Sequence, residues 1–156
     1  MSYQDLSINT VVLFVGIPAS GKSTFYHRYF SDSFARVNLD TLHTRSKEQS
    51  AIESCFANGK SFVVDNTNLT KEVRQKYISM AKSAGYRMVA YCFQSSTRDC
   101  LARNAERTGK AKVPNAIMAS MARKLEPPDK SEGFDLIYSV CIADNEFVVK
   151  PMKEDC

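Results

Sequence analysis

The stretch Thr10–Thr24, TVVLFVGIPASGKST, decides the fold of this chain. Residues 10–15 are β-branched or apolar with no polar alternation, which predicts a strand buried on both faces of a parallel sheet. A loop with two glycines follows it, and after the loop aromatic residues recur at helical spacing: Phe25, Tyr26, Tyr29 and Phe30. The order strand, glycine loop, helix is therefore predicted for this part of the chain.

The loop Gly16–Ser23 matches the pattern G-x-x-x-x-G-K-[ST]. In such a loop backbone N–H groups surround phosphate oxygens, the lysine reaches the β- and γ-phosphates, and the hydroxyl binds Mg²⁺. The glycines leave room for the turn and the phosphate, and the following helix N-terminus attracts the anion. We therefore expect ATP and Mg²⁺ as cofactors, bound by Gly16, Ala19, Ser20, Gly21, Lys22, Ser23 and Thr24. The alternative is a glycine turn beside a surface lysine.

Strands and helices alternate along the rest of the chain. Further strands are predicted at 34–39, 61–65, 86–93 and 134–143, and Phe147–Val149 either adds an edge strand or packs on the surface. The alternation predicts an α/β fold with a mainly parallel five-stranded sheet. Together with the loop motif, we expect the three-layer α/β/α P-loop NTPase fold. The segment 108–113 is basic and small and is expected to be mobile. A short lid is part of the expected fold.

Four helices are predicted beyond the first. They cover 41–56, the stretch between Asn68 and Gly85, 97–107 with Thr97 as its cap, and the stretch from Pro114 to Leu125. The predicted apolar faces are Val73, Tyr77, Ala81 and Ala84 in the second of these helices, and Ile117, Met121 and Leu125 in the last.

The composition of the chain is that of one globular domain, which we expect to span residues 1–156. A net charge of +4 favours anionic partners without demanding them. The five cysteines form no C-x-x-C pair and are odd in number, which argues against a disulfide framework and a zinc site. With no signal peptide or membrane-spanning run to be read, the cytoplasm is the expected location.

Asp40 follows the second predicted strand, and ligands of open α/β sheets lie beyond the carboxyl ends of the strands. A carboxylate beside the phosphate loop can accept a proton from an attacking hydroxyl. The alternative is that Asp40 only caps the helix expected near Thr41. His43, three residues later, is a candidate contact to the acceptor.

Asp65 follows the third predicted strand, where phosphate-loop proteins place an acid near Mg²⁺ or its water shell. We therefore expect Asp65 to act with Ser23 at the metal and to lie at the substrate. Asn68 offers a further short polar side chain at the same edge of the sheet. The alternative is that Asp65 and Asn68 occur there because such residues favour turns and caps.

Arg103 and Arg107 are four residues apart on a predicted helix, so they are expected to project from one face. Like charges at this spacing repel, and an anion between them would reverse the sign. Arg103 has a possible ion-pair partner in Asp99, one turn earlier. A guanidinium over the γ-phosphate would stabilise charge in the transition state, and we expect this of Arg107 above all.

The sequence resembles the kinase domain of the 5′-hydroxyl polynucleotide kinases, of both the phage type and the animal DNA-repair type. The motifs that carry the resemblance are Gly16-x-Pro18-x-x-Gly21-Lys22-Ser23-Thr24, Val37-Asn38-Leu39-Asp40-Thr41, Val64-Asp65-Asn66-Thr67-Asn68, Tyr77-Ile78-x-x-Ala81-Lys82-x-x-Gly85, and Arg103-Asn104-x-x-Arg107 with Val113-Pro114. The resemblance implies that Lys22 and Ser23 bind ATP and metal, that Asp40 activates the 5′-hydroxyl, and that Arg107 lies in a lid over the phosphates. The phage-type enzymes have an arginine where this chain has His43, and 156 residues leave no room for a fused phosphatase or ligase domain.

Three functions are compatible with these motifs. The first is ATP-dependent phosphorylation of a 5′-hydroxyl end of DNA or RNA, with a single-stranded end as the acceptor and Lys22, Asp40 and Arg107 as catalytic residues. The second is a kinase for a metabolite hydroxyl. The chain has no long insertion between Asp40 and Ser61 that would enclose a small substrate, which argues against this function. The third is a nucleotide-binding module without catalysis, which would not need an acceptor base.

Overall fold

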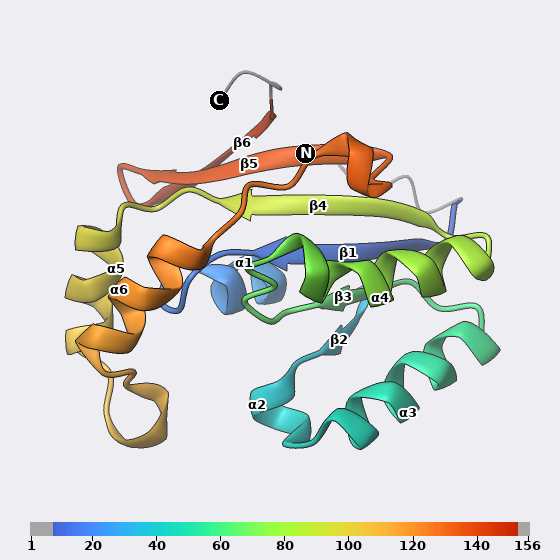
Figure 1. The fold of residues 1–156 in the computed structure, drawn as a ribbon, viewed down its shortest axis with the longest axis horizontal. Helices are drawn as coiled ribbons and strands as arrows, with labels where there is room; N and C mark the ends of the chain where they lie inside the picture. Colours follow the sequence, from blue (N-terminus) through green and yellow to red (C-terminus); the bar gives the residue numbers. More distant parts are fainter. Residues whose placement is uncertain (1–7, 153–156) are drawn as a thin grey trace.

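The computed structural model of the chain describes residues 8–152, in which a six-stranded sheet lies between layers of helices (Figure 1). The strand order is β2-β3-β1-β4-β5-β6; the first five strands are parallel, and β6 runs antiparallel to β5. The strands are β1 Thr10–Val15, β2 Ala35–Val37, β3 Phe62–Val64, β4 Arg87–Phe93, β5 Leu136–Ala143 and β6 Glu146–Pro151. The predicted three-layer α/β/α fold with a mainly parallel sheet is confirmed, and Phe147–Val149 lies in a sixth strand.

The helices surround the sheet on both faces and at one end (Figure 1). They are α1 Lys22–Tyr29, α2 Leu39–Leu42, α3 Arg45–Ala57, α4 Lys71–Ser83, α5 Thr97–Ala105 and α6 Asn115–Lys124, with short 3₁₀ turns at Gly109–Ala111 and Lys130–Glu132. Helices α3 and α4 cover one face of the sheet, α1 covers the other, and α5 and α6 lie at the end where β1 and β4 finish. None of the helices within 8–152 is long and apolar enough for a membrane span.

Strand β1 is the centre of the core, and all six of its residues are buried. Val11 and Leu13 pack toward α3 and α4, whereas Val12 and Phe14 pack toward α1. The register pairs Leu13 with Val64 of β3, and Val64 with Val37 of β2. The residues that follow these three strands therefore emerge at one edge of the sheet, which is where the sequence places its polar motifs.

The helix predicted at 41–56 is instead two helices, α2 and α3. His43 has a φ of 71° and ends α2, and the Thr44 side chain then accepts a hydrogen bond from the Lys47 N–H to begin α3. The second strand is also shorter than predicted. It ends at Val37 because Asn38 is already the N-cap of α2.

The apolar face predicted for α4 is wrong in two of its four residues. Tyr77 and Ala81 are buried as expected, but Val73 is 40% exposed and Ala84 is also exposed. Arg74, a charged residue, takes the buried place, where it pairs with Glu132 and donates to three backbone carbonyls. A buried charge with every donor satisfied is tolerated, and such a residue escapes a pattern that counts apolar side chains.

The predictions for α5 and α6 need three corrections. Ser96, not Thr97, caps α5, and its side chain accepts from the Asp99 N–H. In α6, Met121 and Leu125 pack against the core as predicted, but Ile117 is 46% exposed and its neighbour Met118 is fully buried in its place. Pro114 precedes the first helical turn as its N-cap.

Candidate active site

The loop between β1 and α1 is closed around the side chain of Lys22. Its ammonium donates to the carbonyl oxygens of Gly16 at 2.9 Å and Ile17 at 2.7 Å. A Cβ on Gly16 would lie 2.9 Å from Ser20 Oγ, so a larger residue there would displace the loop. Gly21 has a φ of 101°, which only glycine adopts at low cost. Both glycines of the motif are therefore needed to form the loop itself.

The Lys22 ammonium links the loop electrostatically to the other candidate residues. Burial lowers its pKa from 10.5 to about 8, and the carboxylates of Asp65 and Asp40 oppose that shift. The charge of Arg107 acts in the same direction as burial. Asp40, Asp65 and Arg107 come from three separate segments, and the fold brings all three charges within range of Lys22.

Ser23 and Asp65, the two predicted metal ligands, lie together at the edge of the sheet. The Ser23 hydroxyl donates to Asp65 Oδ2 at 3.4 Å, and the Asp65 side chain is 2% exposed. Magnesium in phosphate-loop enzymes is held by one or two protein oxygens together with phosphates and water. The Ser23 hydroxyl and the Asp65 carboxylate fit that requirement. Both already bind one cation, a guanidinium that lies between them.

That guanidinium belongs to Arg36 of β2, which the sequence analysis missed. Its Nε and Nη2 lie 2.9 and 2.8 Å from Asp65 Oδ2, and Nη2 also donates to Ser23 Oγ at 2.9 Å. The guanidinium lies over the Tyr26 ring as well. The one signal in the sequence was a charged residue inside a short apolar strand, and nothing in that signal specified the partners.

Asp40 lies in the first turn of α2 and not at the end of a strand. Its neighbour Asn38 caps the helix, because Asn38 Oδ1 accepts from the Thr41 N–H at 3.1 Å. Capping is therefore the task of Asn38, which leaves the Asp40 carboxylate free. Asp40 is exposed and has no hydrogen bond or ion pair to any residue in 8–152.

Asn68 and His43, two predicted substrate contacts, differ in burial and in their hydrogen bonds. Asn68 is 2% exposed, and its Nδ2 donates to the carbonyl oxygens of Phe14 and Val64, so it joins the ends of β1 and β3. This position makes it a brace beneath the loop, and its Oδ1 is buried without a hydrogen-bond partner among the described residues. His43 is exposed at the end of α2, where its N–H donates to the Leu39 carbonyl.

Arg103 and Arg107 do not share a helix face, because α5 ends at Ala105. Arg103 donates to the Ala19 carbonyl at 2.6 Å, a contact between α5 and the phosphate loop, and not to Asp99, its possible partner. Arg107 is exposed and donates to Ala111 at 3.3 Å. Arg103 thus supports the loop, while Arg107 directly precedes the basic segment 108–113, which we call the lid segment.

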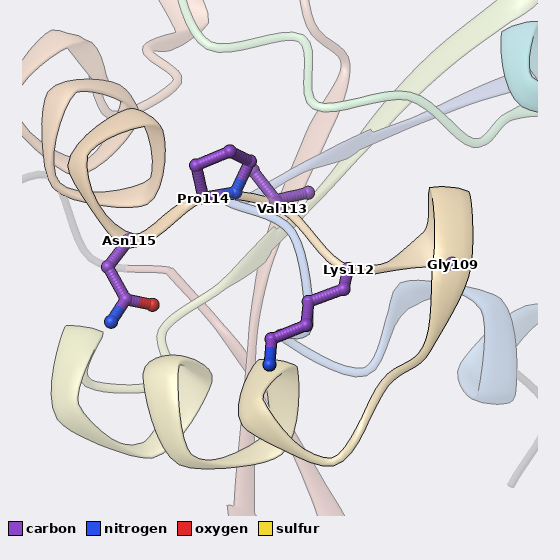
Figure 2. A pocket seen from close by; sticks show the side chains of 5 residues that line it. All are labelled: Gly109, Lys112, Val113, Pro114 and Asn115. Carbon is purple, nitrogen blue, oxygen red and sulfur yellow. The ribbon is translucent and has the colours of Figure 1, made fainter.

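The lid segment is anchored at its end nearest α6. Asn104 is fully buried, its Nδ2 donates to the Val113 carbonyl, and its Oδ1 accepts from the Val113 N–H at 2.9 Å. Beside this anchor is an open hollow of about 450 Å³ lined by Gly109, Lys112, Val113, Pro114 and Asn115. Figure 2 shows the Lys112 and Asn115 side chains extending to the same side of the backbone. The hollow therefore carries one positive charge and one amide.

Residues 11–128 match the model of a family of AAA domains. The chain belongs to that family. It is 30% identical over 145 residues to a bifunctional polynucleotide phosphatase/kinase of Schizosaccharomyces pombe, covering 87% of this chain and 35% of that protein. This similarity confirms the resemblance to polynucleotide kinases found in the motifs. The chain spans about a third of the length of that relative.

Two further similarities widen the range of kinases. An L-seryl-tRNA(Sec) kinase of Methanococcus maripaludis is 25% identical over 146 residues, covering 81% of this chain and 56% of that protein. The crystal structure of a gluconokinase from Sinorhizobium meliloti matches with a TM-score of 0.57 at 20% identity, covering 88% of this chain and 85% of that chain. The chain thus has the fold of P-loop kinases. The names of these relatives indicate that they act on different acceptors.

Proposed function

We propose that this protein transfers the γ-phosphate of ATP to a 5′-hydroxyl end of DNA or RNA. The observation that carries the proposal is the Asp40 carboxylate, which is exposed, unpaired among the described residues, and close enough to act on the charge of Lys22. A nucleotide-binding module has no use for such a group. The name of the S. pombe relative supports a polynucleotide acceptor.

In the proposed reaction Lys22 and the amides of the loop hold the β- and γ-phosphates of ATP. Ser23 and Asp65 would hold Mg²⁺, which neutralises developing charge on the phosphates when bound. Asp40 takes the proton from the acceptor hydroxyl, whose oxygen forms the new bond to phosphorus while the bond to the ADP oxygen breaks. Arg107, released from Ala111, lies over the γ-phosphate, and Arg103 keeps the loop in place.

The four cysteines within the described residues are free thiols: Cys55, Cys92, Cys100 and Cys141. Free thiols support a reducing compartment, so we place the protein in the cytoplasm. No group of three or more histidine, cysteine or acidic side chains in 8–152 is arranged to hold a metal ion. The metal of the proposed reaction therefore depends on Ser23, Asp65 and the nucleotide together.

The test is transfer of labelled phosphate from ATP to a panel of 5′-hydroxyl DNA and RNA oligonucleotides, seryl-tRNA and small sugar alcohols. The oligonucleotides are expected to be labelled, and Asp40→Asn should lower the rate by a factor of about 10²–10⁴ with ATP affinity unchanged. Asp32→Asn, at an exposed turn before β2, is the control and should keep the wild-type rate. Labelling of only a small alcohol or of seryl-tRNA, or of no acceptor at all, would refute the proposal.

A further inference from the structure

We propose that Glu48 of α3 is a positioning residue for Asp40, because it orients the amide of Asn66 and Asn66 holds the N-terminus of α2. This inference rests on the proposed function, since it assigns to Asp40 the role of acceptor base. It adds a residue that lies in another helix and touches neither nucleotide nor acceptor.

Helix α2 has little packing to hold Asp40 in place. It has four residues, none of them is buried, and Leu42 packs against the core only as a partly buried side chain. A helix of this length gains too few hydrogen bonds to offset the cost of its first turn. Its geometry therefore depends strongly on polar partners outside it, and two asparagines supply them.

The two asparagines bind the first backbone N–H groups of α2. Asn38 Oδ1 accepts from Thr41 N at 3.1 Å, and Asn66 Oδ1 accepts from Leu39 N at 2.9 Å. Leu39 is the residue directly before Asp40. The Asn38 side chain also donates to the Asp65 carbonyl, so α2 is tied to the segment that carries the predicted metal ligand.

Glu48 decides which way the Asn66 amide faces. Asn66 Nδ2 donates to Glu48 Oε2 at 3.0 Å. An amide presents one accepting and one donating side, whereas an ionised carboxylate only accepts. Glu48 therefore requires the NH₂ side of Asn66 and turns its oxygen toward the Leu39 N–H. The opposite orientation would set two acceptors together at Glu48 and two donors together at Leu39.

Besides Asn66, Glu48 is held by two donors from α4 and one from its own helix α3. Tyr77 Oη donates to Oε1 at 2.9 Å, Lys76 Nζ lies 3.2 Å from Oε1, and Arg45 Nη1 also lies 3.2 Å from it. The side chain is 2% exposed. Burial alone would raise the pKa of Glu48, but the hydrogen bonds from Tyr77 and Lys76 and the charges of Lys76 and Arg45 lower it below 4.5. The carboxylate is thus ionised and accepts only.

A purely structural role explains this arrangement poorly. Taking a carboxylate out of water is costly, and an apolar side chain of similar size often gives equal or greater stability. Glu48 is on the same buried side of α3 as Ile52 and Cys55. An apolar residue at position 48 would serve that core but would leave Asn66 free to turn.

The experiment compares Glu48→Gln with Glu53→Gln, which alters an exposed glutamate of the same helix that bonds Gln49. In Glu48→Gln we expect kcat with a 5′-hydroxyl oligonucleotide to fall about 10–100-fold, the size of effect seen for groups that orient a functional side chain. The KM for ATP should stay within about twofold, because the phosphate loop is untouched. Amide exchange at Leu39 should accelerate, and Glu53→Gln should match the wild type in all three measurements.

A second variant covers the case in which Glu48→Gln does not fold. Asn66→Ala removes the same link and leaves Glu48 with its other three donors, so it should lower kcat and accelerate Leu39 exchange in the same way. Unchanged kcat and unchanged Leu39 exchange in a folded variant of either kind would overturn the inference. If the wild type phosphorylates no acceptor, the proposed function fails, whereas Leu39 exchange still decides whether Glu48 holds α2.

Discussion

The phosphate loop and the side of the site that we propose for the acceptor, here called the acceptor side, are built in different ways. In the loop, Lys22 binds carbonyl oxygens only five and six residues earlier in the chain. On the acceptor side, α2 is held by Asn66, 27 residues from Leu39, and Asn66 is oriented by Glu48 of another helix. One region is thus formed mainly by neighbours in sequence, and the other by partners that only the fold brings together.

The difference explains why one half of the site is visible in the sequence and the other is not. A loop closed by its own residues needs them at fixed spacing, so it leaves a motif. A helix held by distant side chains can be supported from many positions in the chain. The supporting residues therefore have no fixed spacing that would appear as a motif. Substitutions on the two sides should accordingly differ in what they disturb.

The largest expected effect on stability comes from Arg36→Met, which removes a contact between residues far apart in sequence. It leaves the Asp65 carboxylate, 2% exposed, without its counter-ion, and breaking such a pair costs about 3–5 kcal/mol when buried. Since Arg36 is 24% exposed, we expect about 3 kcal/mol in urea denaturation. Mg²⁺ should recover part of this loss, because Asp65 then has a free carboxylate for the cation.

Arg28→Met is the matched control for this change. The Arg28 guanidinium lies 5.3 Å from the centre of the Phe147 ring, a contact worth about 0.5–1 kcal/mol. Its loss should not be recovered by Mg²⁺. Equal responses of the two variants to Mg²⁺ would show that Arg36 does not occupy the cation position between Ser23 and Asp65.

An intermediate effect is expected for Gly21→Ala, within the locally built loop. The added Cβ would lie 3.1 Å from Phe147 and 3.2 Å from Ile142, and the backbone has a φ of 101°. Backbone strain and crowding together should cost about 2–3 kcal/mol in urea denaturation. ATP binding should weaken as well, because the loop must shift.

Gly109→Ala separates the two causes of that loss. Gly109 has a φ of 63°, but nothing lies within 4 Å of its added Cβ, so about 1 kcal/mol of backbone strain remains. The difference between the two variants measures the crowding at Gly21. If both lose the same stability, the β5–β6 hairpin does not constrain the loop.

The expected effect that vanishes at neutral pH is a pH dependence of ATP binding through Lys22. Its pKa of about 8 in the free protein must rise when a triphosphate binds, so binding takes up a proton above pH 8. Affinity should fall by up to about tenfold per pH unit from 8 toward 10.5. In that range the unfolded chain still carries this proton and the free folded protein does not, so the group adds stability as pH rises.

Calorimetry in buffers of different ionisation enthalpy measures the proton uptake. Lys22→Arg keeps its charge over this range, so its affinity, although lower, should not depend on pH between 8 and 10. Proton uptake in that variant equal to the wild-type value would assign the titration to another group.

Several elements could be predicted from the sequence because each depends on local properties. Strand β1, the glycine loop, α1 and the alternation that leads to the parallel sheet follow from apolar runs and glycine positions. The predicted roles of Lys22, Asp40 and Arg107 stay predictions that the transfer assay will test. The errors have a common cause: Val73, Ile117 and the break at His43 were decided by packing and caps that propensity does not contain.

The chain by itself determined the phosphate loop, the class of fold and the edge of the sheet at which the polar residues gather, because chain geometry over a few residues is enough to specify them. Only the tertiary structure decided that Arg36 lies between Ser23 and Asp65, and that Glu48 is linked to the Leu39 N–H through Asn66. These contacts join residues that are far apart in sequence and depend on strand order, register and burial. The interaction energy of an ion pair is large only where the fold excludes water around it, and no local sequence pattern specifies where that happens.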